Sequence, residues 1–107
     1  MIEFAYFEGC PNAMQTLQNL KAVAAGGQIS LSEIEIVLVP NEQSAKALKF
    51  AGSPSVLVEG IDIYTEQPPS DYSFNCRVYT IGGRHTGVLP TAYIGKQIQR
   101  IRARQSE

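Results

Sequence analysis

The chain of 107 residues has no surplus of positive charge and no long apolar run. Its nine Lys and Arg residues are balanced by ten Asp and Glu residues, which leaves a formal net charge of −1. Because phosphate binding requires a surplus of cations, we expect no nucleic-acid partner. No apolar run approaches the ~20 residues of a membrane-spanning helix. The first residues also lack the basic region of a signal peptide, so we expect a cytoplasmic location and no membrane association.

Cysteine and histidine are scarce as well. The chain has two cysteines, Cys10 and Cys76, and one histidine, His85. A domain of this size can fold without disulfide bridges, and in a reducing compartment two cysteines are more often free, redox-active or metal-binding than structural. No Cys or His pair has the close spacing of a zinc site, and no Cys-His-Asn set can be assigned. We therefore predict no zinc site and no bound cofactor.

What the sequence does contain is an alternation of apolar strands and amphipathic helices. The predicted strands are residues 2–7, 34–39, 55–58 and 61–64. The predicted helices run from Pro11 to Gly26, from the N-cap Asn41 to Gly52, and from Thr91 to about Ala103. The order β-α-β-α-β-β-α predicts a single α/β domain over residues 1–107. Its four-stranded sheet should be mixed, with the first two strands parallel, an antiparallel hairpin, and helices on both faces.

Cys10 lies where the first strand ends and the first helix begins, in the sequence GCPNA. Pro11 suits the first position of a helix, and a thiolate at a helix N-terminus is stabilised by free N–H groups and the helix dipole. The amides of Asn12 and Ala13 could point at the sulfur, whereas the nearby Glu8 opposes ionisation. We favour a reactive, exposed Cys10 with a depressed pKa. The alternative is a small buried hydrophobic side chain.

Three motifs in this order, GCPNA, GSPSV and CRVY, make nearly the whole chain resemble small bacterial proteins of the thioredoxin-like superfamily. The resemblance implies a thioredoxin-like fold, an active Cys10, and a cis Pro54 at the start of the third strand. A cis Pro54 would turn the Ser53 backbone toward Cys10 and Pro11, where it could dock an extended peptide or glutathione. The alternative is a trans proline opening an edge strand.

The chain departs from the dithiol pattern of this superfamily at Ala13, which takes the place of the second cysteine. What remains resembles a monothiol arrangement, or one with a resolving cysteine elsewhere. Whether the chain is an enzyme is therefore left open.

Residues 65–90 form an inserted loop, longer than a minimal domain of this kind needs. The fourth strand should end at the Cys10 end of the sheet, so the loop should leave there and Cys76 could reach Cys10. Cys76 would then be a resolving thiol or a second ligand for a thiophilic ion. The alternative is a lone cysteine on an inserted strand.

Other side chains of this loop are weaker candidates for the site. Arg77, with Arg84 and His85, could bind a substrate anion or keep a thiolate ionised, although we favour the simpler explanation that they are exposed charges on a loop. The loop aromatics could cover the Cys10 end, pack into the core or form a contact between two copies of the chain.

Two hypotheses of function follow from these residues. The first is a thiol protein that exchanges with a protein or glutathione-like disulfide, with Cys10 as nucleophile, Cys76 resolving, and Ser53 and Pro54 as the docking edge. The second is a binding module without turnover. It would hold a soft metal ion or an organomercurial between Cys10 and Cys76, or bind a protein through the sheet edge and the aromatic loop.

Overall fold

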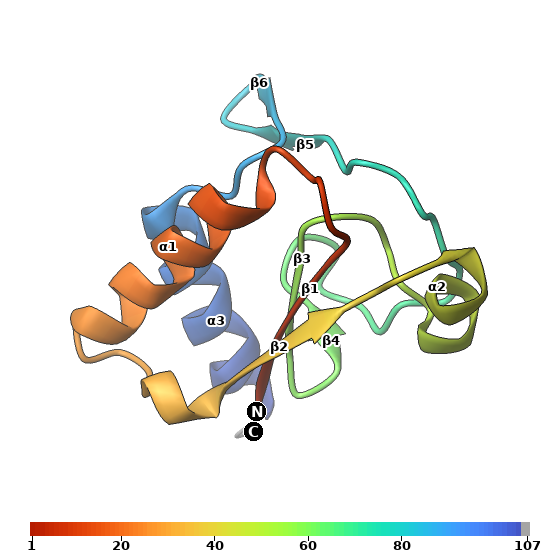
Figure 1. The fold of residues 1–107 in the computed structure, drawn as a ribbon. Coiled ribbons are helices and arrows are strands. Elements are labelled where there is room, and N and C mark those ends of the chain that lie inside the picture. Colours follow the sequence, from red (N-terminus) through yellow and green to blue (C-terminus); the bar gives the residue numbers. More distant parts are fainter. Residues whose placement is uncertain (106–107) are drawn as a thin grey trace.

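A four-stranded mixed sheet lies at the centre of the fold, in a computed structural model that describes residues 1–105 (Figure 1). Its strands are β1 (Ile2–Tyr6), β2 (Ile34–Leu38), β3 (Ser55–Val58) and β4 (Ile61–Asp62). They lie in the order β2-β1-β3-β4. β1 and β2 are parallel, whereas β3 is antiparallel to both β1 and β4. The predicted sheet and its strand directions are therefore confirmed.

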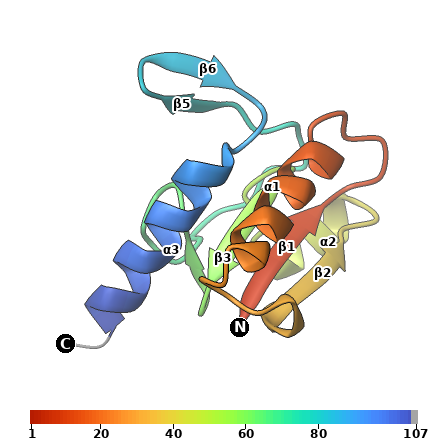
Figure 2. The ribbon, with the colours of Figure 1, turned by 90° about the vertical axis from the view of Figure 1, so that its left-hand side faces the viewer.

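Helices cover both faces of this sheet. The helices are α1 (Ala13–Ala25), α2 (Glu42–Leu48) and α3 (Thr91–Gln105), with a short 3₁₀ helix η1 (Leu31–Glu33) before β2. Figure 2 shows α1 and α3 side by side over one face, and Figure 1 shows α2 on the opposite side. None of the helices in the described residues has the length and apolar content needed to cross a bilayer.

The alternation of side chains along β1 divides the interior into two cores. Ile2 and Phe4 face α1 and α3 in the larger core, whereas Ala5 faces the smaller core beneath α2. Fully burying one large aliphatic or aromatic side chain contributes about 1.5–3 kcal/mol, so the larger core holds the sheet against these two helices. Its fully buried members include Leu20, Val56, Val58, Ile63, Tyr79, Leu89, Ile94 and Ile98.

The first helix begins later than the sequence predicts. Pro11 was expected at its first position, but α1 starts at Ala13, and Asn12 is its N-cap. Cys10, Pro11 and Asn12 instead form a turn, which is closed by a bond of 3.3 Å from the Ala13 N–H to the Cys10 carbonyl oxygen. The prediction for Pro11 was therefore wrong, because Pro11 lies within this turn and the helix starts two residues later.

Two further boundaries differ from the prediction for similar local reasons. Helix α2 ends at Leu48 and not at Gly52, because Lys49 adopts the left-handed conformation (φ 54°) and caps the helix with its N–H. Strand β4 ends at Asp62, whose Oδ1 accepts a hydrogen bond of 2.8 Å from the Tyr64 N–H. That bond turns the chain away from the sheet two residues earlier than expected.

The inserted loop contains a hairpin of two short strands, β5 (Tyr79–Ile81) and β6 (Arg84–Thr86). Gly82 and Gly83 connect them with positive φ values of 60° and 78°, as a two-residue hairpin turn requires. An inserted strand carrying Cys76 was one of the expectations for this loop, but β5 begins three residues after Cys76, and β6 was not predicted. Figure 1 shows the hairpin beside the turn that follows β1, which is the end of the sheet where Cys10 lies.

Candidate functional site

Cys10 lies in the turn between β1 and α1 and belongs to the larger core. The residue is only 8% exposed, which corrects the expectation that this junction is open to solvent. Its own backbone is part of the turn, with the Cys10 N–H donating to the Phe7 carbonyl oxygen at 3.3 Å. The Ala13 amide, expected to point at the sulfur, donates to the Cys10 carbonyl oxygen instead. Cys10 is therefore a buried thiol at the end of the sheet, three residues before the helix.

The peptide bond between Ser53 and Pro54 is cis, as the resemblance implied. Ser53 is completely buried just before β3. Its hydroxyl oxygen accepts a hydrogen bond of 3.3 Å from the Phe7 N–H, and this bond ties the residue to the turn that carries Cys10. The structure therefore brings Ser53 and Pro54 to the Cys10 end of the sheet.

The backbone of Ser53 is already paired with another part of the chain. Its N–H donates to the Asn75 carbonyl oxygen at 2.9 Å, and its carbonyl oxygen accepts from the Arg77 N–H at 2.8 Å. These two bonds form a parallel bridge between Ser53 and Cys76. The expectation that this edge is free to dock an extended peptide was wrong, because the inserted loop occupies it.

This pairing places the two thiols together. Cys76 is exposed as a residue, yet partial burial of its sulfur raises the pKa of the thiol above its ordinary value of 9.0, and the charge and hydrogen bonding of the Cys10 sulfur raise it further. Both cysteines are free thiols. The inserted loop thus brings Cys76 to the Cys10 end of the sheet, near enough for Cys10 to affect the ionisation of Cys76, as expected from the strand directions.

Arg77 turns its side chain inward, away from any approaching anion. Its Nη1 lies 2.5 Å from Asp62 Oδ2 and 3.1 Å from Ser55 Oγ. The guanidinium carbon also lies 5.5 Å and 4.8 Å from the ring centres of Tyr64 and Tyr79. Burial alone would lower the pKa of Arg77, but its hydrogen bond to Asp62 helps to raise it above the ordinary value. We therefore do not retain Arg77 as an anion-binding residue.

Tyr79 fastens the same segment to the cis-proline. Its ring is fully buried, and its hydroxyl donates to the Pro54 carbonyl oxygen at 2.5 Å. Burial is also the main cause that raises the pKa of this phenol above its ordinary value. Of the roles considered for the loop aromatics, Tyr79 therefore has the core-packing one.

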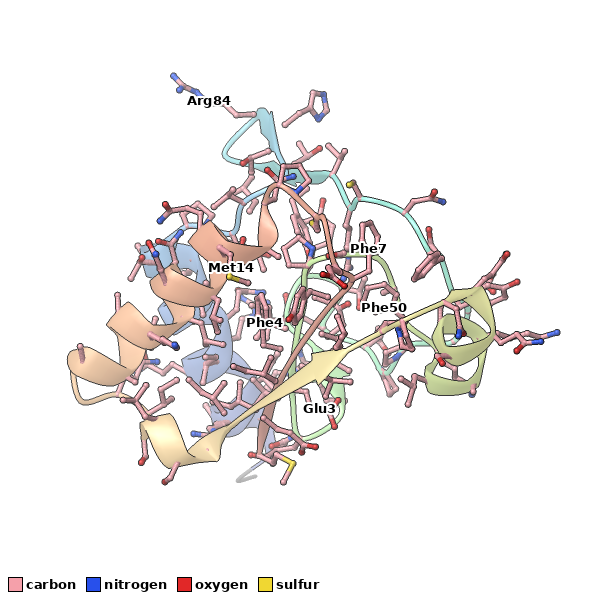
Figure 3. All side chains as sticks on the ribbon, viewed as in Figure 1. Glu3, Phe4, Phe7, Met14, Phe50 and Arg84 are labelled. Atoms are coloured by element: carbon pink, nitrogen blue, oxygen red, sulfur yellow. The ribbon has the colours of Figure 1, made fainter. Side chains whose placement is uncertain are left out.

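The other charged candidates of the loop lie on the hairpin. Arg84 and His85 are exposed residues of β6, and Figure 3 shows Arg84 extending outward from the far end of the hairpin. His85 Nδ1 lies 3.0 Å from Thr80 Oγ1, on the neighbouring strand. Within the described part of the chain, no group of three or more His, Cys, Asp and Glu side chains is placed to hold a metal ion.

Two residues that the sequence reasoning missed position Cys76. Asp62 is 3% exposed at its side chain and holds Arg77, the residue next to Cys76. Gly52 has a φ of +116°, and a Cβ there would lie 3.2 Å from Arg77 Cβ and 3.2 Å from the Asn75 oxygen. A signal for Asp62 was present, since an acidic residue within an apolar strand usually requires a buried partner.

Cys10, Cys76 and the cis-proline therefore lie at one end of the sheet. Comparison of the chain with protein-family models, with curated proteins and with solved structures gives no match.

Proposed function

We propose that this chain is a thioredoxin-like thiol protein in which Cys10 and Cys76 act as a pair in thiol–disulfide exchange. The observation that carries the proposal is the bridge between Ser53 and Cys76, which brings Cys76 to the end of the sheet where Ser53 Oγ is bonded to the Cys10 turn. The two cysteines lie 66 positions apart in the sequence. Cys76 would supply the second thiol that Ala13 cannot provide.

The architecture supports the thioredoxin-like part of this proposal. The sheet order β2-β1-β3-β4, in which β3 alone runs opposite to the other three strands, agrees with the element order that the resemblance implies. The first cysteine follows β1, and a cis-proline precedes β3 at the same end of the sheet. Since one fold hosts many chemistries, the proposed activity rests on the proximity of the two thiols and not on the architecture.

The exchange balances as a two-electron reaction. A thiolate of the pair attacks one sulfur of a disulfide R–S–S–R, which forms a mixed disulfide and releases RS⁻. The other thiol of the pair, once deprotonated, attacks the protein sulfur of that mixed disulfide and releases the second RS⁻. The two thiol protons of the protein end on the two released thiolates. The products are the Cys10–Cys76 disulfide and two RSH molecules, so the protein is oxidised and the substrate is reduced.

A redox titration of the purified chain tests this proposal. The chain is equilibrated in glutathione buffers of increasing oxidation, quenched with acid and analysed by intact mass. We expect a species that has lost two hydrogen atoms, with Cys10 and Cys76 linked in its peptide map. Cys10→Ser and Cys76→Ser serve as matched controls, and each must abolish this species. The proposal would be contradicted if no disulfide between Cys10 and Cys76 formed within one chain, even in fully oxidised glutathione.

The second hypothesis, a soft-metal module, is favoured by the same proximity of the two cysteines, because two neighbouring thiolates suit a two-coordinate soft cation. The two functions differ in one measurable respect. A metal module binds copper(I) tightly through both cysteines while its thiols resist oxidation by glutathione. An exchange protein forms the internal disulfide readily.

A further inference from the structure

The geometry points to low-molecular-weight disulfides as the substrates of the Cys10–Cys76 pair, and against extended polypeptides that dock along the cis-proline edge. This inference rests on the exchange activity proposed above and specifies its substrate class. It depends on the short stretch Asn75–Arg77, here called the docked segment, which lies along Ser53.

The docked segment uses the groups that an incoming peptide would need. An exposed sheet edge captures an extended peptide through unpaired backbone N–H and carbonyl groups. Here the N–H and the carbonyl oxygen of Ser53 are both bonded to the docked segment, at 2.9 Å and 2.8 Å. The pairing extends to the preceding residues, because the Ser73 N–H donates to the Phe50 carbonyl oxygen at 2.7 Å. An incoming peptide could form these backbone hydrogen bonds only by displacing the docked segment of the protein.

Side-chain anchors make that displacement costly. Arg77 is bonded to the buried Asp62, and lifting the segment would leave the Asp62 carboxylate without its counter-ion. Two residues beyond the segment, the Tyr79 hydroxyl holds the Pro54 carbonyl oxygen. The Arg77 guanidinium also lies over the Tyr79 ring. Both backbone hydrogen bonds and side-chain interactions therefore hold the docked segment in place.

The same arrangement leaves one thiol accessible to small reagents. Cys76, in the middle of the docked segment, is exposed, whereas Cys10 is 8% exposed. A small disulfide can therefore reach Cys76 without any backbone pairing. The Cys76 thiolate attacks one of its sulfurs and releases RS⁻. The Cys10 thiolate then attacks the Cys76 sulfur, which forms the internal disulfide and releases the second RS⁻, as balanced above.

A comparison of two glutathione disulfides tests the substrate class. The first reagent is oxidised glutathione. The second is a peptide of about six residues, the length of a typical strand, whose central cysteine carries glutathione in a mixed disulfide. For the wild-type chain we expect the internal disulfide to form no faster with the peptide than with oxidised glutathione, because the peptide gains no backbone hydrogen bonds at the occupied edge. A free edge offering about two such bonds would favour the peptide roughly tenfold, and that result would overturn the inference.

Two glycine variants show whether the docked segment keeps the peptide from pairing with the Ser53 edge. Gly52→Ala presses a Cβ against Asn75 and Arg77, whereas Gly60→Ala adds a methyl group where nothing lies within 4 Å. Both glycines have positive φ, +116° and +82°, so both variants carry backbone strain. We expect Gly52→Ala to accelerate the reaction with the peptide several-fold and Gly60→Ala to leave both rates unchanged. The same change in both variants would overturn the role of the segment.

Hydrogen exchange provides a measurement that does not depend on a folded Gly52→Ala variant. In the wild-type chain the Ser53 and Arg77 amides should exchange as slowly as those of β3, because both are bonded within the docked segment. Exchange at the rate of an unfolded chain would overturn the inference. The two proposals fail differently. If neither reagent forms the internal disulfide, the exchange function fails, and if the peptide reacts roughly tenfold faster than oxidised glutathione, only the substrate class fails.

Discussion

The ion pair between Arg77 and Asp62 is the single-residue interaction that most directly positions the exposed thiol. The two side chains are 11% and 3% exposed, so both charges are almost fully removed from water. Such a pair adds little net stability compared with apolar residues, but removing one partner is costly because the other charge stays buried and unpaired. Arg77 adjoins Cys76, so the cost falls on the segment that carries the thiol.

We expect Asp62→Asn to lower the free energy of unfolding by about 3–5 kcal/mol, the usual cost of breaking a buried pair from one side. Asparagine retains the Oδ1 acceptor for the Tyr64 N–H, so the variant isolates the loss of charge. Urea denaturation followed by circular dichroism measures the change.

The matched control for this variant is Glu66→Gln. Glu66 pairs with Arg100 and Arg104, whose side chains are more than half exposed. Exposed pairs contribute about 0–1 kcal/mol, so the control should change stability far less. Similar losses in both variants would show that the Arg77 pair is not effectively buried.

Among the secondary-structure elements, α2 depends most on its N-cap because it has only seven residues. Asn41 accepts a hydrogen bond of 2.8 Å from the Ser44 N–H at its Oδ1. The helix buries Ala45 in the smaller core, with Val39 and Phe50. Weakening the cap should therefore loosen the face of the sheet opposite α1 and α3.

We expect Asn41→Ala to lower the free energy of unfolding by about 1 kcal/mol, since the substitution removes a side-chain cap. Asn12→Ala is the comparison, because Asn12 is the N-cap of α1 but makes no capping hydrogen bond with its side chain. Thermal denaturation of the two variants under identical conditions measures the difference. A greater loss in Asn12→Ala would contradict this account of the caps.

For the molecule as a whole, α3 is tied to distant segments by exposed ion pairs. Arg102 lies 2.8 Å from Glu33 and 3.1 Å from Glu59, and Arg100 lies 2.7 Å from Glu66. The pKa values of all three carboxyls lie below the ordinary 4.5. The main causes are the Ser30 backbone N–H for Glu33, the Met1 ammonium group for Glu59, and Arg100 for Glu66.

We expect the melting temperature to fall as the pH drops below 4.5. Each of these carboxyls binds a proton less readily in the folded chain than in the unfolded chain. Their contribution is therefore fully present above the ordinary pKa and is lost as the pH falls through the lowered values. Thermal melts from about pH 6 to about pH 2 measure the loss.

Arg102→Gln provides the control for this pH dependence. The variant removes a hydrogen-bond partner that lowers the pKa of both Glu33 and Glu59. Its melting temperature should consequently depend less steeply on pH in the acid range. An unchanged slope would mean that other groups cause the acid sensitivity.

Features that depend on neighbouring residues could be predicted from the amino-acid sequence alone. The β-branched runs predicted the strands, Asn41 marked the start of α2, and helical periodicity located α1 and α3. The direction of each strand also followed from the order of elements, because the connections between them are short. These are local or topological constraints, so a single chain carries enough information to predict them.

Which distant groups meet follows only from the three-dimensional packing of the chain. The pairing of Ser53 with Cys76 depends on how the loop crosses the sheet end, and no periodicity encodes it. The burial of Cys10 and the inward turn of Arg77 depend on that same packing, since burial and ion pairing are set by whatever lies opposite in space. Local sequence therefore predicted the scaffold and the two thiols, whereas long-range packing decided which thiol is exposed and which edge is already occupied.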